Sequence, residues 1–243
     1  MIEVRGLKKQ FEGKEVLKGV DLEIYDNETL VILGPSGQGK TVMIKSMIRL
    51  MEPDGGEIYF DGEDIRKLNR RELEDFRKKI AYVFQNSALF DFLDVRENLA
   101  LFLRMHKKLK EDEIEEKIVK ALSFVGLSDD VLDKYPEELS GGMKKRVAIA
   151  RAMIKEPKYI FYDEPTTGLD KKNAELVSNL IMVLKEKVSA TSIIVTHDIE
   201  LMEKVSDRVA LLKDGKIIFI GKKEEISDET LEYLYSIGDT YEV

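Results

Sequence analysis

The feature that most constrains this chain is the glycine-rich segment GPSGQGKT at residues 34–41. It fits the phosphate-loop pattern GxxxxGK(S/T), and it lies between a short apolar run, Thr29 to Leu33, and a helix-like run, Val42 to Met51. Strand, glycine loop and helix, in that order, form the context in which this pattern binds nucleotide phosphates. A plain glycine turn is the alternative, and the agreement of the flanking features disfavours it.

Each residue type in this loop suits one part of a nucleotide. Glycines allow backbone turns closed to residues with a Cβ, so successive N–H groups can point at one anion. The helix that follows adds its unpaired N–H groups and its positive dipole end. Lys40 is expected to reach the β and γ phosphates, and Thr41 to ligate Mg²⁺. The predicted binding set is Gly34, Pro35, Ser36, Gly37, Gln38, Gly39, Lys40, Thr41 and Val42.

Length and charge exclude several classes of protein. The 243 residues fit one large α/β domain, or one with a small insert. The 39 Lys+Arg against 47 Asp+Glu give a formal charge of -8, which argues against a broad nucleic-acid surface. There is no cysteine for a disulfide or a thiolate metal site. The N-terminus lacks the apolar core of a signal peptide, and no run approaches the roughly 18 apolar residues of a membrane helix.

Apolar patterns predict an α/β fold with a largely parallel sheet. The first 24 residues alternate, which predicts an antiparallel β piece with a turn at Glu12-Gly13. A continuous apolar run at residues 80–85 predicts a buried parallel strand, and strands over 158–163 and 191–196, alternating with helices, predict a largely parallel sheet. We also expect a turn at 53–56, helices over 70–79, 171–188 and 199–205, and hairpins at Asp61-Gly62 and Asp214-Gly215.

The middle of the chain changes character, because residues 94–124 predict two helices and no strand. Apolar residues from Ile114 to Val125 fall on one helix face, with Gly126 as a stop. A second loop-to-helix unit follows over 140–156. We predict a single domain over 1–243, with a core formed by 1–84 and 157–222, a helical insert with the second loop-helix unit over 85–156, and a short helical appendage over 223–243.

Two carboxylates follow a buried strand. Asp163, at the carboxyl end of an apolar run, is placed to hold a water of the Mg²⁺ shell if its strand lies near the phosphate loop. Glu164 is expected on the other side of the strand end, where it could polarise a water attacking the γ-phosphate. A pair of solvated acids at a strand end is the plainer interpretation, which the phosphate loop disfavours.

Two further polar residues end apolar strands. His197 can hydrogen-bond the γ-phosphate or the attacking water, although a lone histidine is usually structural or exposed. Gln85 can reach Mg²⁺ or the water and lose that contact when the next segment moves. His106 lies in a basic helix end and is expected at the surface.

The segment LSGGM at residues 139–143 predicts a second anion site. Ser140 can cap a helix whose first turn contains Gly141 and Gly142, so bare N–H groups face an anion at a positive helix end. One phosphate loop and one detached helix end suggest two copies that complete each other's sites. The basic cluster that follows, residues 144–146, is expected to be a solvated face.

These segments, in this order and over nearly the whole chain, resemble the ATP-binding subunit of ABC transporters. The resemblance implies that Phe11 stacks on adenine, with Val16 packing nearby, and that Asp170 lies in the D-loop at the nucleotide site. In family terms GPSGQGKT is the Walker A motif, Gln85 the Q-loop, LSGGM the signature, YIFYDE the Walker B motif with its acid, GLD the D-loop and His197 the switch histidine.

The resemblance also implies an activity and its partners. The family hydrolyses ATP with Mg²⁺ in a head-to-tail dimer, in which two ATP molecules lie between the Walker A motif of one copy and the signature of the other. Closure and reopening drive an integral membrane permease that docks beside the Q-loop, here at residues 86–102. We therefore expect a cytoplasmic chain held at the inner face of the cell membrane by its permease, with no nucleic-acid partner.

Three positions depart from the family pattern without removing a phosphate, metal or water ligand: Met143 replaces a usual glutamine, Val42 a second hydroxyl and Lys171 a proline. The segments SALFDFLDVRENLA, LSGGMKKR and DEPTTGLD are similar to Mla-type ATPases, which serve phospholipid transport with a permease and a lipid-binding partner. The alternatives are a non-transport ABC ATPase that clamps a soluble or division-associated partner, and a nucleic-acid-associated ATPase, which the net negative charge disfavours.

Overall fold

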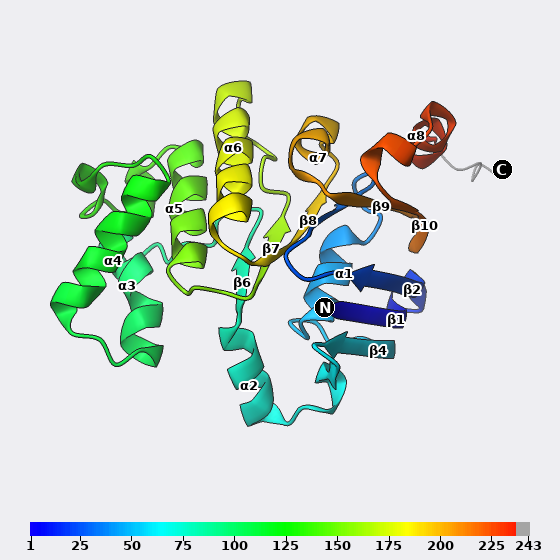
Figure 1. The fold of residues 1–243 in the computed structure, drawn as a ribbon, viewed down its shortest axis with the longest axis horizontal. Helices are drawn as coiled ribbons and strands as arrows, with labels where there is room; N and C mark the ends of the chain where they lie inside the picture. Colours follow the sequence, from blue (N-terminus) through cyan, green and yellow to red (C-terminus); the bar gives the residue numbers. More distant parts are fainter. Residues whose placement is uncertain (237–243) are drawn as a thin grey trace. The chain divides into compact units, whose positions relative to one another are not determined.

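A computed structural model describes residues 1–236 and confirms the α/β fold (Figure 1). The chain divides into two compact units, one formed by Met1–Leu73 with Ile193–Val243 and the other by Glu74–Ser192. We call them unit 1 and unit 2. The predicted division into a core and a helical insert remains a prediction, and the last residues of the predicted appendage, 237–243, lie outside the described residues.

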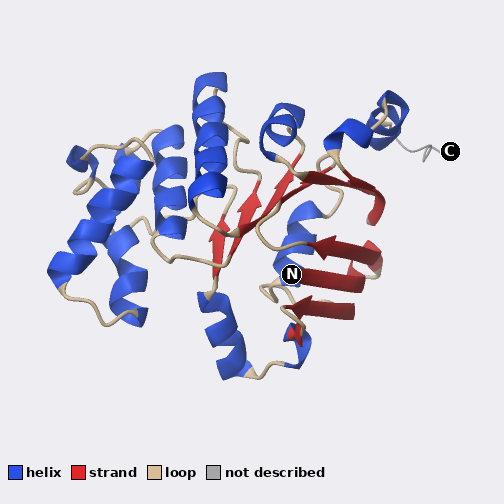
Figure 2. Cartoon of the chain, in the orientation of Figure 1, coloured by secondary structure: helices blue, strands red, loops and turns tan. Residues whose placement is uncertain are grey.

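Unit 1 contains the predicted antiparallel β piece. Its strands alternate buried and exposed side chains, and Ile2 pairs with Ile24 on one side and Phe60 on the other. Glu12 and Gly13 have φ angles of 49° and 81° and form the expected turn. The strands are β1 (Ile2–Phe11), β2 (Lys14–Ile24), β4 (Gly55–Phe60) and β5 (Glu63–Asp64), in the order β2-β1-β4-β5 (Figure 2).

A second set of strands in unit 1 carries the phosphate loop. Every residue of β3 (Thr29–Leu33) is buried, and β3 pairs in parallel with β9 (Arg208–Lys213). An antiparallel hairpin joins β9 to β10 (Lys216–Gly221), as Asp214-Gly215 predicted. The strand order here is β10-β9-β3-β8, where β8 is Thr191–Thr196 and the chain enters unit 1 at Ile193.

The first helix of unit 1 is shorter than the sequence predicts. The first helix was expected to reach Met51, but α1 (Lys40–Met47) ends earlier, because Arg49 is left-handed with φ 52°. The Arg49 guanidinium donates to the carbonyls of Ile65 (2.8 Å) and Leu68 (3.1 Å), which fixes it there. The other helices are η1 (Ile65–Lys67), α7 (Ile199–Val205), η4 (Lys223–Glu225) and α8 (Asp228–Tyr235), and α2 (Arg70–Lys78) carries the chain out of the unit.

A second correction concerns the glycine pair that was expected in a turn. Gly55 and Gly56 instead begin strand β4. At Gly56, a Cβ would lie 2.6 Å from the carbonyl oxygen of Gly6 and 2.7 Å from that of Arg5. The glycine is therefore required by a close approach of two backbones within a sheet, which a short glycine-rich segment does not distinguish from a turn.

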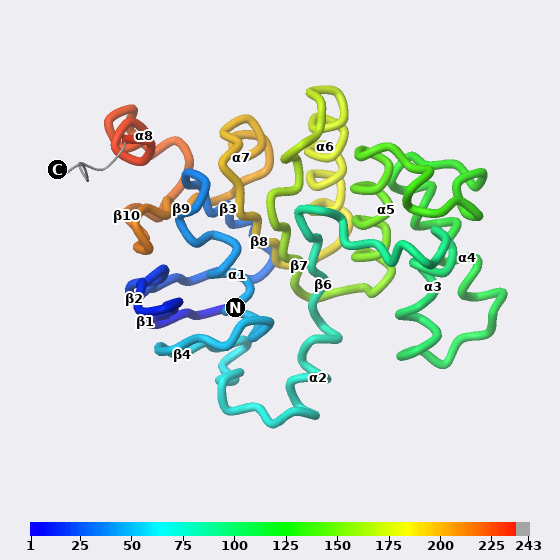
Figure 3. Tube along the Cα trace, turned by 180° about the vertical axis from the view of Figure 1, so that it is seen from behind, coloured from blue at the N-terminus to red at the C-terminus, as the bar shows by residue number. Residues whose placement is uncertain are grey.

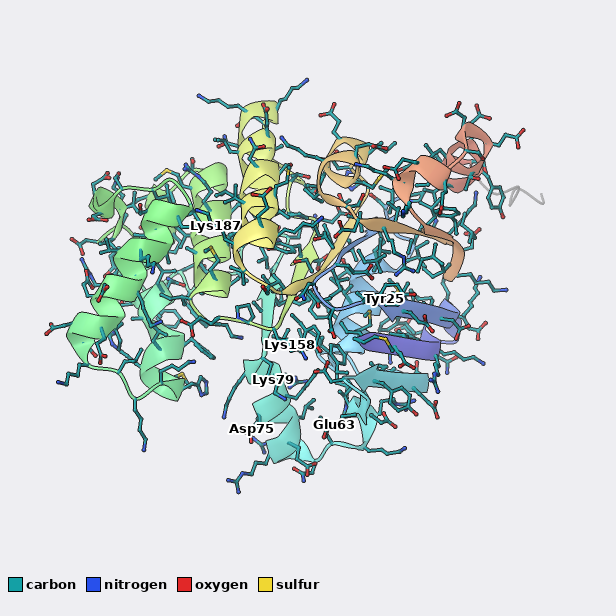
Figure 4. The ribbon with its side chains drawn as sticks, in the orientation of Figure 1. Tyr25, Glu63, Asp75, Lys79, Lys158 and Lys187 are labelled. Carbon is teal, nitrogen blue, oxygen red and sulfur yellow. The ribbon has the colours of Figure 1, made fainter. Side chains whose placement is uncertain are left out.

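Unit 2 contains two parallel strands and the four longest helices among the described residues. The strands β6 (Ile80–Val83) and β7 (Tyr159–Asp163) pair in parallel, and the Lys158 N–H donates to the Lys79 carbonyl (2.9 Å) where they begin (Figure 4). The predicted strand to residue 85 ends at Val83. The helices are α3 (Val95–His106), α4 (Glu111–Phe124), η2 (Asp129–Val131), η3 (Pro136–Glu138), α5 (Gly141–Met153) and α6 (Lys171–Lys187).

Helices α3, α4 and α5 pack against one another, and α5 also contacts β6 and α6 (Figure 3). Their packing includes one buried amide, Asn98, which is 1% exposed. Its Oδ1 accepts from the Phe90 N–H (2.8 Å), and its Nδ2 donates to the carbonyls of Phe90, Leu93 and Asp94. Among residues 1–236, none of the helices has the length and apolar content that spanning a bilayer requires.

Candidate nucleotide-binding site

The phosphate loop in unit 1 is held by its neighbouring strands. Gly34 follows β3, and its N–H donates to the Thr196 carbonyl at the end of β8 (3.2 Å). A Cβ on Gly34 would lie 2.4 Å from the carbonyl oxygen of Leu212, so only glycine fits there. Ser36 and Gly37 are exposed, whereas Lys40 is 5% exposed. The loop backbone is thus fixed at its start and open at its tip.

Lys40 closes the loop on itself. Its Nζ donates to the carbonyls of Gly34 (2.7 Å) and Pro35 (2.9 Å). Gly39 precedes α1 with a left-handed φ of 91°, and a Cβ there would lie 2.8 Å from Val16 Cγ1. An ammonium in a loop of this kind is a group that can bind phosphate oxygens in place of carbonyl partners.

The structure also gives the surroundings of the other residues of unit 1 that were predicted around the loop. Gln38 Oε1 accepts from the Asp214 N–H (2.5 Å), which ties the loop to the β9–β10 turn. Thr41 and Val42, in the first turn of α1, are half-buried. Val16 lies beside Gly39, since a Cβ added to Gly39 would come within 2.8 Å of Val16 Cγ1. Phe11, at the end of β1, is 42% exposed, and the Lys9 ammonium lies over its ring, 5.3 Å from the ring centre.

His197 follows β8 in unit 1 and is exposed. Its carbonyl accepts a hydrogen bond from the Tyr235 hydroxyl of α8 (3.3 Å). The next residue, Asp198, caps α7 by accepting from the Leu201 N–H (3.1 Å). The histidine backbone is therefore held between a helix cap and the C-terminal helix.

In unit 2, Asp163 and Glu164 are almost completely buried, with 3% and 7% exposed. The Tyr82 hydroxyl donates to Asp163 Oδ2 (2.9 Å), and burial together with the negative charge of Asp163 raises the pKa of Tyr82. Glu164 has a left-handed φ of 47°, so strand alternation does not set its direction; its Oε2 accepts from Thr167 Oγ1 (3.0 Å). Two buried carboxylates with fixed oxygens suit metal-water and general-base roles.

The sequence pattern did not predict a role for Tyr82. Its partner lies 81 positions away, and the only sequence signal is that a tyrosine within an apolar strand must find a hydrogen-bond partner for its hydroxyl. The partner follows from strand pairing, because Tyr82 of β6 stands beside Phe161 of β7 in the parallel register.

Lys145 differs from the prediction in its burial. Residues 144–146 were expected to form a solvated face. Lys145 is 2% exposed, and its Nζ donates to the carbonyls of Phe84 (3.2 Å) and Gln85 (2.6 Å). Burial lowers the pKa of Lys145 to about 8, although the charges of Asp163 and Glu164 oppose that shift. The prediction failed because α5 packs on β6, and Lys145 faces the residues that follow this strand.

The signature segment forms the predicted helix start. Ser140 is exposed, and its Oγ accepts from the Met143 N–H (3.3 Å) at the first turn of α5. Gly141 is exposed, whereas Gly142 is buried, and a Cβ on Gly142 would lie 2.3 Å from Asn173 Oδ1. Asn173 in turn donates to Asp170 through its N–H (3.0 Å) and Nδ2 (2.5 Å), and these bonds lower the pKa of Asp170.

Within each unit, therefore, the structure brings together part of the predicted site. Unit 1 joins the phosphate loop to Val16, with the Gly34 N–H bonded to the strand that His197 follows. Unit 2 joins the Gln85 backbone to the signature helix and orients Asp163. A phosphate loop at the end of a buried strand, with acids and a capped glycine helix on the same chain, defines an α/β protein of the nucleotide-binding class.

Comparisons with known proteins identify the family. The ABC transporter family matches residues 17–167, and this chain belongs to it. The probable ribonucleotide transport ATP-binding protein Mkl of Mycobacterium leprae is 40% identical over 230 residues, which are 94% of this chain and 66% of that protein. The chain therefore spans slightly less than two thirds of that relative's length.

This chain is also similar to a plant protein and to a solved structure. The chloroplastic Arabidopsis thaliana protein trigalactosyldiacylglycerol 3 is 39% identical over 247 residues, covering 95% of this chain and 71% of that protein. The dimeric structure of a post-hydrolysis state of the ATP-binding cassette MJ0796, bound to ADP and Pi, superposes with a TM-score of 0.84 at 33% identity, covering 91% of this chain and 98% of that one.

Proposed function

We propose that this chain is the ATP-binding and ATP-hydrolysing subunit of an ABC transporter, which powers a separate membrane permease through ATP-driven head-to-tail dimerisation. The single observation that carries the proposal is the pairing, on one chain of this family, of a phosphate loop closed by Lys40 with a glycine helix start capped by Ser140. Each can bind phosphate, and two copies are needed if one nucleotide is to use both kinds of site.

The donor set fits a nucleotide with Mg²⁺. A lysine ammonium, loop N–H groups and a helix N-terminus suit phosphate oxygens, while the Thr41 hydroxyl, the Gln85 amide and the Asp163 carboxylate are oxygen donors of the kind that Mg²⁺ prefers. When bound, Mg²⁺ neutralises charge on the phosphates. Around it, Lys40 would hold the phosphates, and Asp163 would be kept in one orientation by Tyr82.

Hydrolysis would need a group that takes a proton from water. We assign that role to Glu164, whose Oε2 is already held by Thr167. His197 would hydrogen-bond the γ-phosphate or the water, Gln85 would contact the metal or the water, and Phe11 would stack on adenine with Val16 beside the loop. The partner copy would add its own signature residues and Asp170. The dimeric post-hydrolysis state of MJ0796 bound to ADP and Pi supports dimerisation and hydrolysis, and the roles of the individual residues remain our proposal.

Partners and location follow from the same proposal. We propose a permease at the membrane, with this chain held at the inner face through it. The likeness to Mla-type ATPases and to a relative named after a galactolipid supports a lipid cargo and a lipid-binding partner, whereas the Mkl relative carries the name of ribonucleotide transport. The lipid assignment therefore rests on the sequence segments and one of these two names.

The decisive experiment compares Glu164→Gln with Glu186→Gln, an exposed glutamate of α6 in unit 2. Under single-turnover conditions with Mg²⁺, Glu164→Gln should bind ATP, remain an ATP-bound dimer by light scattering, and hydrolyse at least about a hundredfold more slowly, as expected for the loss of a general base. Lys40→Ala should instead weaken nucleotide binding. Wild-type single-turnover rates in the Gln variant would refute the assignment of Glu164.

The transport part has its own test. Purification of the full chain from its own organism in detergent should retain a polytopic permease, and washing in high salt should release the chain from membranes. Recovery of soluble partners alone would favour a non-transport ATPase. Phospholipid bound to a copurified partner would support the lipid assignment.

A further inference from the structure

The signature helix α5 holds the backbone of the Q-loop with basic side chains from its own body. Lys145 lies between the signature and the middle of the helix, and its buried ammonium donates to the carbonyls of Phe84 and Gln85. Lys155, two residues beyond the end of α5, donates to the Ile80 carbonyl at the start of β6. Side chains of α5 and of the residue that follows its cap thus contact successive points of the segment that leads to Gln85.

Arg151 makes the most specific of these contacts. Its Nη2 donates to the Ser87 carbonyl (3.0 Å), and its Nη1 donates to the Ala88 carbonyl (2.8 Å). The guanidinium is planar, so two adjacent carbonyls bound by its two nitrogens have a fixed mutual orientation. Burial lowers the pKa of Arg151, because the guanidinium is partly removed from water.

The two carbonyls bound by Arg151 belong to a strained pair of residues. Ser87 and Ala88 are both left-handed, with φ angles of 61° and 46°. Residues with a Cβ rarely adopt this region, and two in succession are rarer still unless the surroundings enforce it. Here the Ser87 N–H donates to the Phe84 carbonyl (3.0 Å), and Arg151 supplies the side-chain contacts. The strained turn starts only two residues after Gln85.

We propose that Lys145 and Arg151 are positioning residues, which fix the backbone of residues 84–88 to the signature helix so that the Gln85 side chain is held for its contact with Mg²⁺ or water. This inference rests on the proposed ATPase function for its catalytic meaning. We call the hydrogen bonds from Lys145 and Arg151 to residues 84–88 the clasp. The clasp does not depend on the proposed function, because it is a contact between two parts of unit 2.

The clasp gives the signature a direct mechanical link to the Q-loop. Ser140 and Lys145 lie on one rigid helix, little more than one turn apart. A shift of α5 when its signature binds a partner's nucleotide would move the carbonyls that Lys145 and Arg151 hold. Gln85 of one copy would therefore respond to the nucleotide bound by the Walker A motif of the other copy.

The first test measures amide hydrogen exchange in the full-length protein without nucleotide. Arg151→Lys keeps the charge but loses the planar fork, so amides of residues 86–90 should exchange at least about tenfold faster, the change expected when a charge-assisted hydrogen bond is lost. Arg104→Lys is the matched control, because Arg104 is exposed on α3 in the same unit. Equal exchange in the two variants would overturn the proposal.

The second test measures ATP hydrolysis against Mg²⁺ concentration. Arg151→Lys and Lys145→Met should raise the Mg²⁺ concentration for half-maximal rate several-fold more than they raise the KM for ATP, whereas a general loss of folding would lower the rate at every Mg²⁺ concentration. Adding Ala88→Gly to Arg151→Lys should recover part of the Mg²⁺ response, because glycine adopts the left-handed conformation freely. Absence of both the shift and the recovery would overturn a positioning role.

The two tests separate this inference from the proposed function. If the wild-type chain shows no Mg²⁺-dependent hydrolysis, the ATPase proposal fails, and the exchange experiment alone decides whether Arg151 holds the loop. If hydrolysis is normal and exchange at 86–90 does not respond to Arg151→Lys, the ATPase proposal stands and the clasp is wrong.

Discussion

The hydroxyl of Tyr82 lies 2.9 Å from Oδ2 of Asp163, across a pair of parallel strands. The bond joins the strand that leads to the Q-loop with the strand that ends in the Walker B acid. Because the carboxylate is only 3% exposed, few other groups can fix its orientation from solvent. The hydroxyl therefore holds Oδ2 of Asp163, the carboxylate that we propose for the shell of a metal.

Tyr82→Phe tests this relationship. Removal of the donor leaves the ring in place and should lower the Mg²⁺-dependent rate of ATP hydrolysis about tenfold, because a hydrogen bond to a charged group contributes about 1.5–3 kcal/mol. Binding of ATP without Mg²⁺ should be unchanged. Tyr25→Phe is the control, since Tyr25 is 47% exposed. An unchanged metal-dependent rate in Tyr82→Phe would show that Asp163 is oriented without it.

Gly142 and Gly141 make a matched pair for a stability prediction. A Cβ at Gly142 would lie 2.3 Å from Asn173 Oδ1, whereas at Gly141 it would meet Leu169 at an ordinary 3.7 Å. We expect Gly142→Ala to lower the free energy of unfolding by about 1–3 kcal/mol, the usual cost of overpacking. Gly141→Ala should not. Denaturant titration of both variants measures the difference, and equal stabilities would contradict the packing.

The Gly142→Ala substitution should also affect Asp170 in the D-loop. Asn173 is the partner of Asp170 through two hydrogen bonds, and these lower the pKa of Asp170. Displacement of Asn173 by Gly142→Ala should therefore return the pKa of Asp170 toward its ordinary value. A pH titration of the Asp170 carboxyl by NMR detects this, with Gly141→Ala as the unperturbed reference.

Phe11 gives a prediction about the base rather than the phosphates. Loss of one stacking ring is expected to weaken ATP binding by about 0.5–1.5 kcal/mol, roughly two- to twelve-fold. Inorganic tripolyphosphate has no base, so Phe11→Ala should leave its affinity unchanged. Calorimetric titration with both ligands separates the two cases. Equal losses for ATP and tripolyphosphate would mean that the side chain acts on the loop and not on adenine.

Much of the fold was predictable because it depends on local patterns. The runs that became β3 and β8 have apolar centres and are buried throughout, and the hairpins at Asp61-Gly62 and Asp214-Gly215 rely on residues that accept positive φ. Where a tertiary contact overrides the local pattern, the prediction was wrong. Arg49 ends α1 before Met51 because its guanidinium binds the carbonyls of Ile65 and Leu68.

In the candidate site, too, the features set by neighbouring residues were predictable and the long-range contacts were not. The phosphate loop and the Ser140 cap are defined by residues close in sequence, so their spacing was enough. Tyr82 with Asp163, and Lys145 with Gln85, are contacts over 81 and 60 positions. They depend on which helix face packs on which strand, and a basic cluster such as 144–146 has the same sequence pattern whether it is solvated or buried.

Lys145 finally provides a prediction for pH. Burial lowers its pKa from 10.5 to about 8, so the folded chain releases this proton at a lower pH than the unfolded chain does. Between about pH 8 and 10.5 the unfolded state binds more protons, and the contribution of Lys145 to stability must rise with pH, by at most about 1.4 kcal/mol per pH unit.

Because other groups titrate in this range, the quantity to measure is the unfolding free energy of the wild type minus that of Lys145→Met. This difference should be constant below about pH 7 and increase from pH 8 to 9.5, while the same difference for Lys120→Met, on the exposed side of α4, stays flat. A difference that falls with pH would mean that the carbonyls of Phe84 and Gln85 stabilise the ammonium more than burial destabilises it.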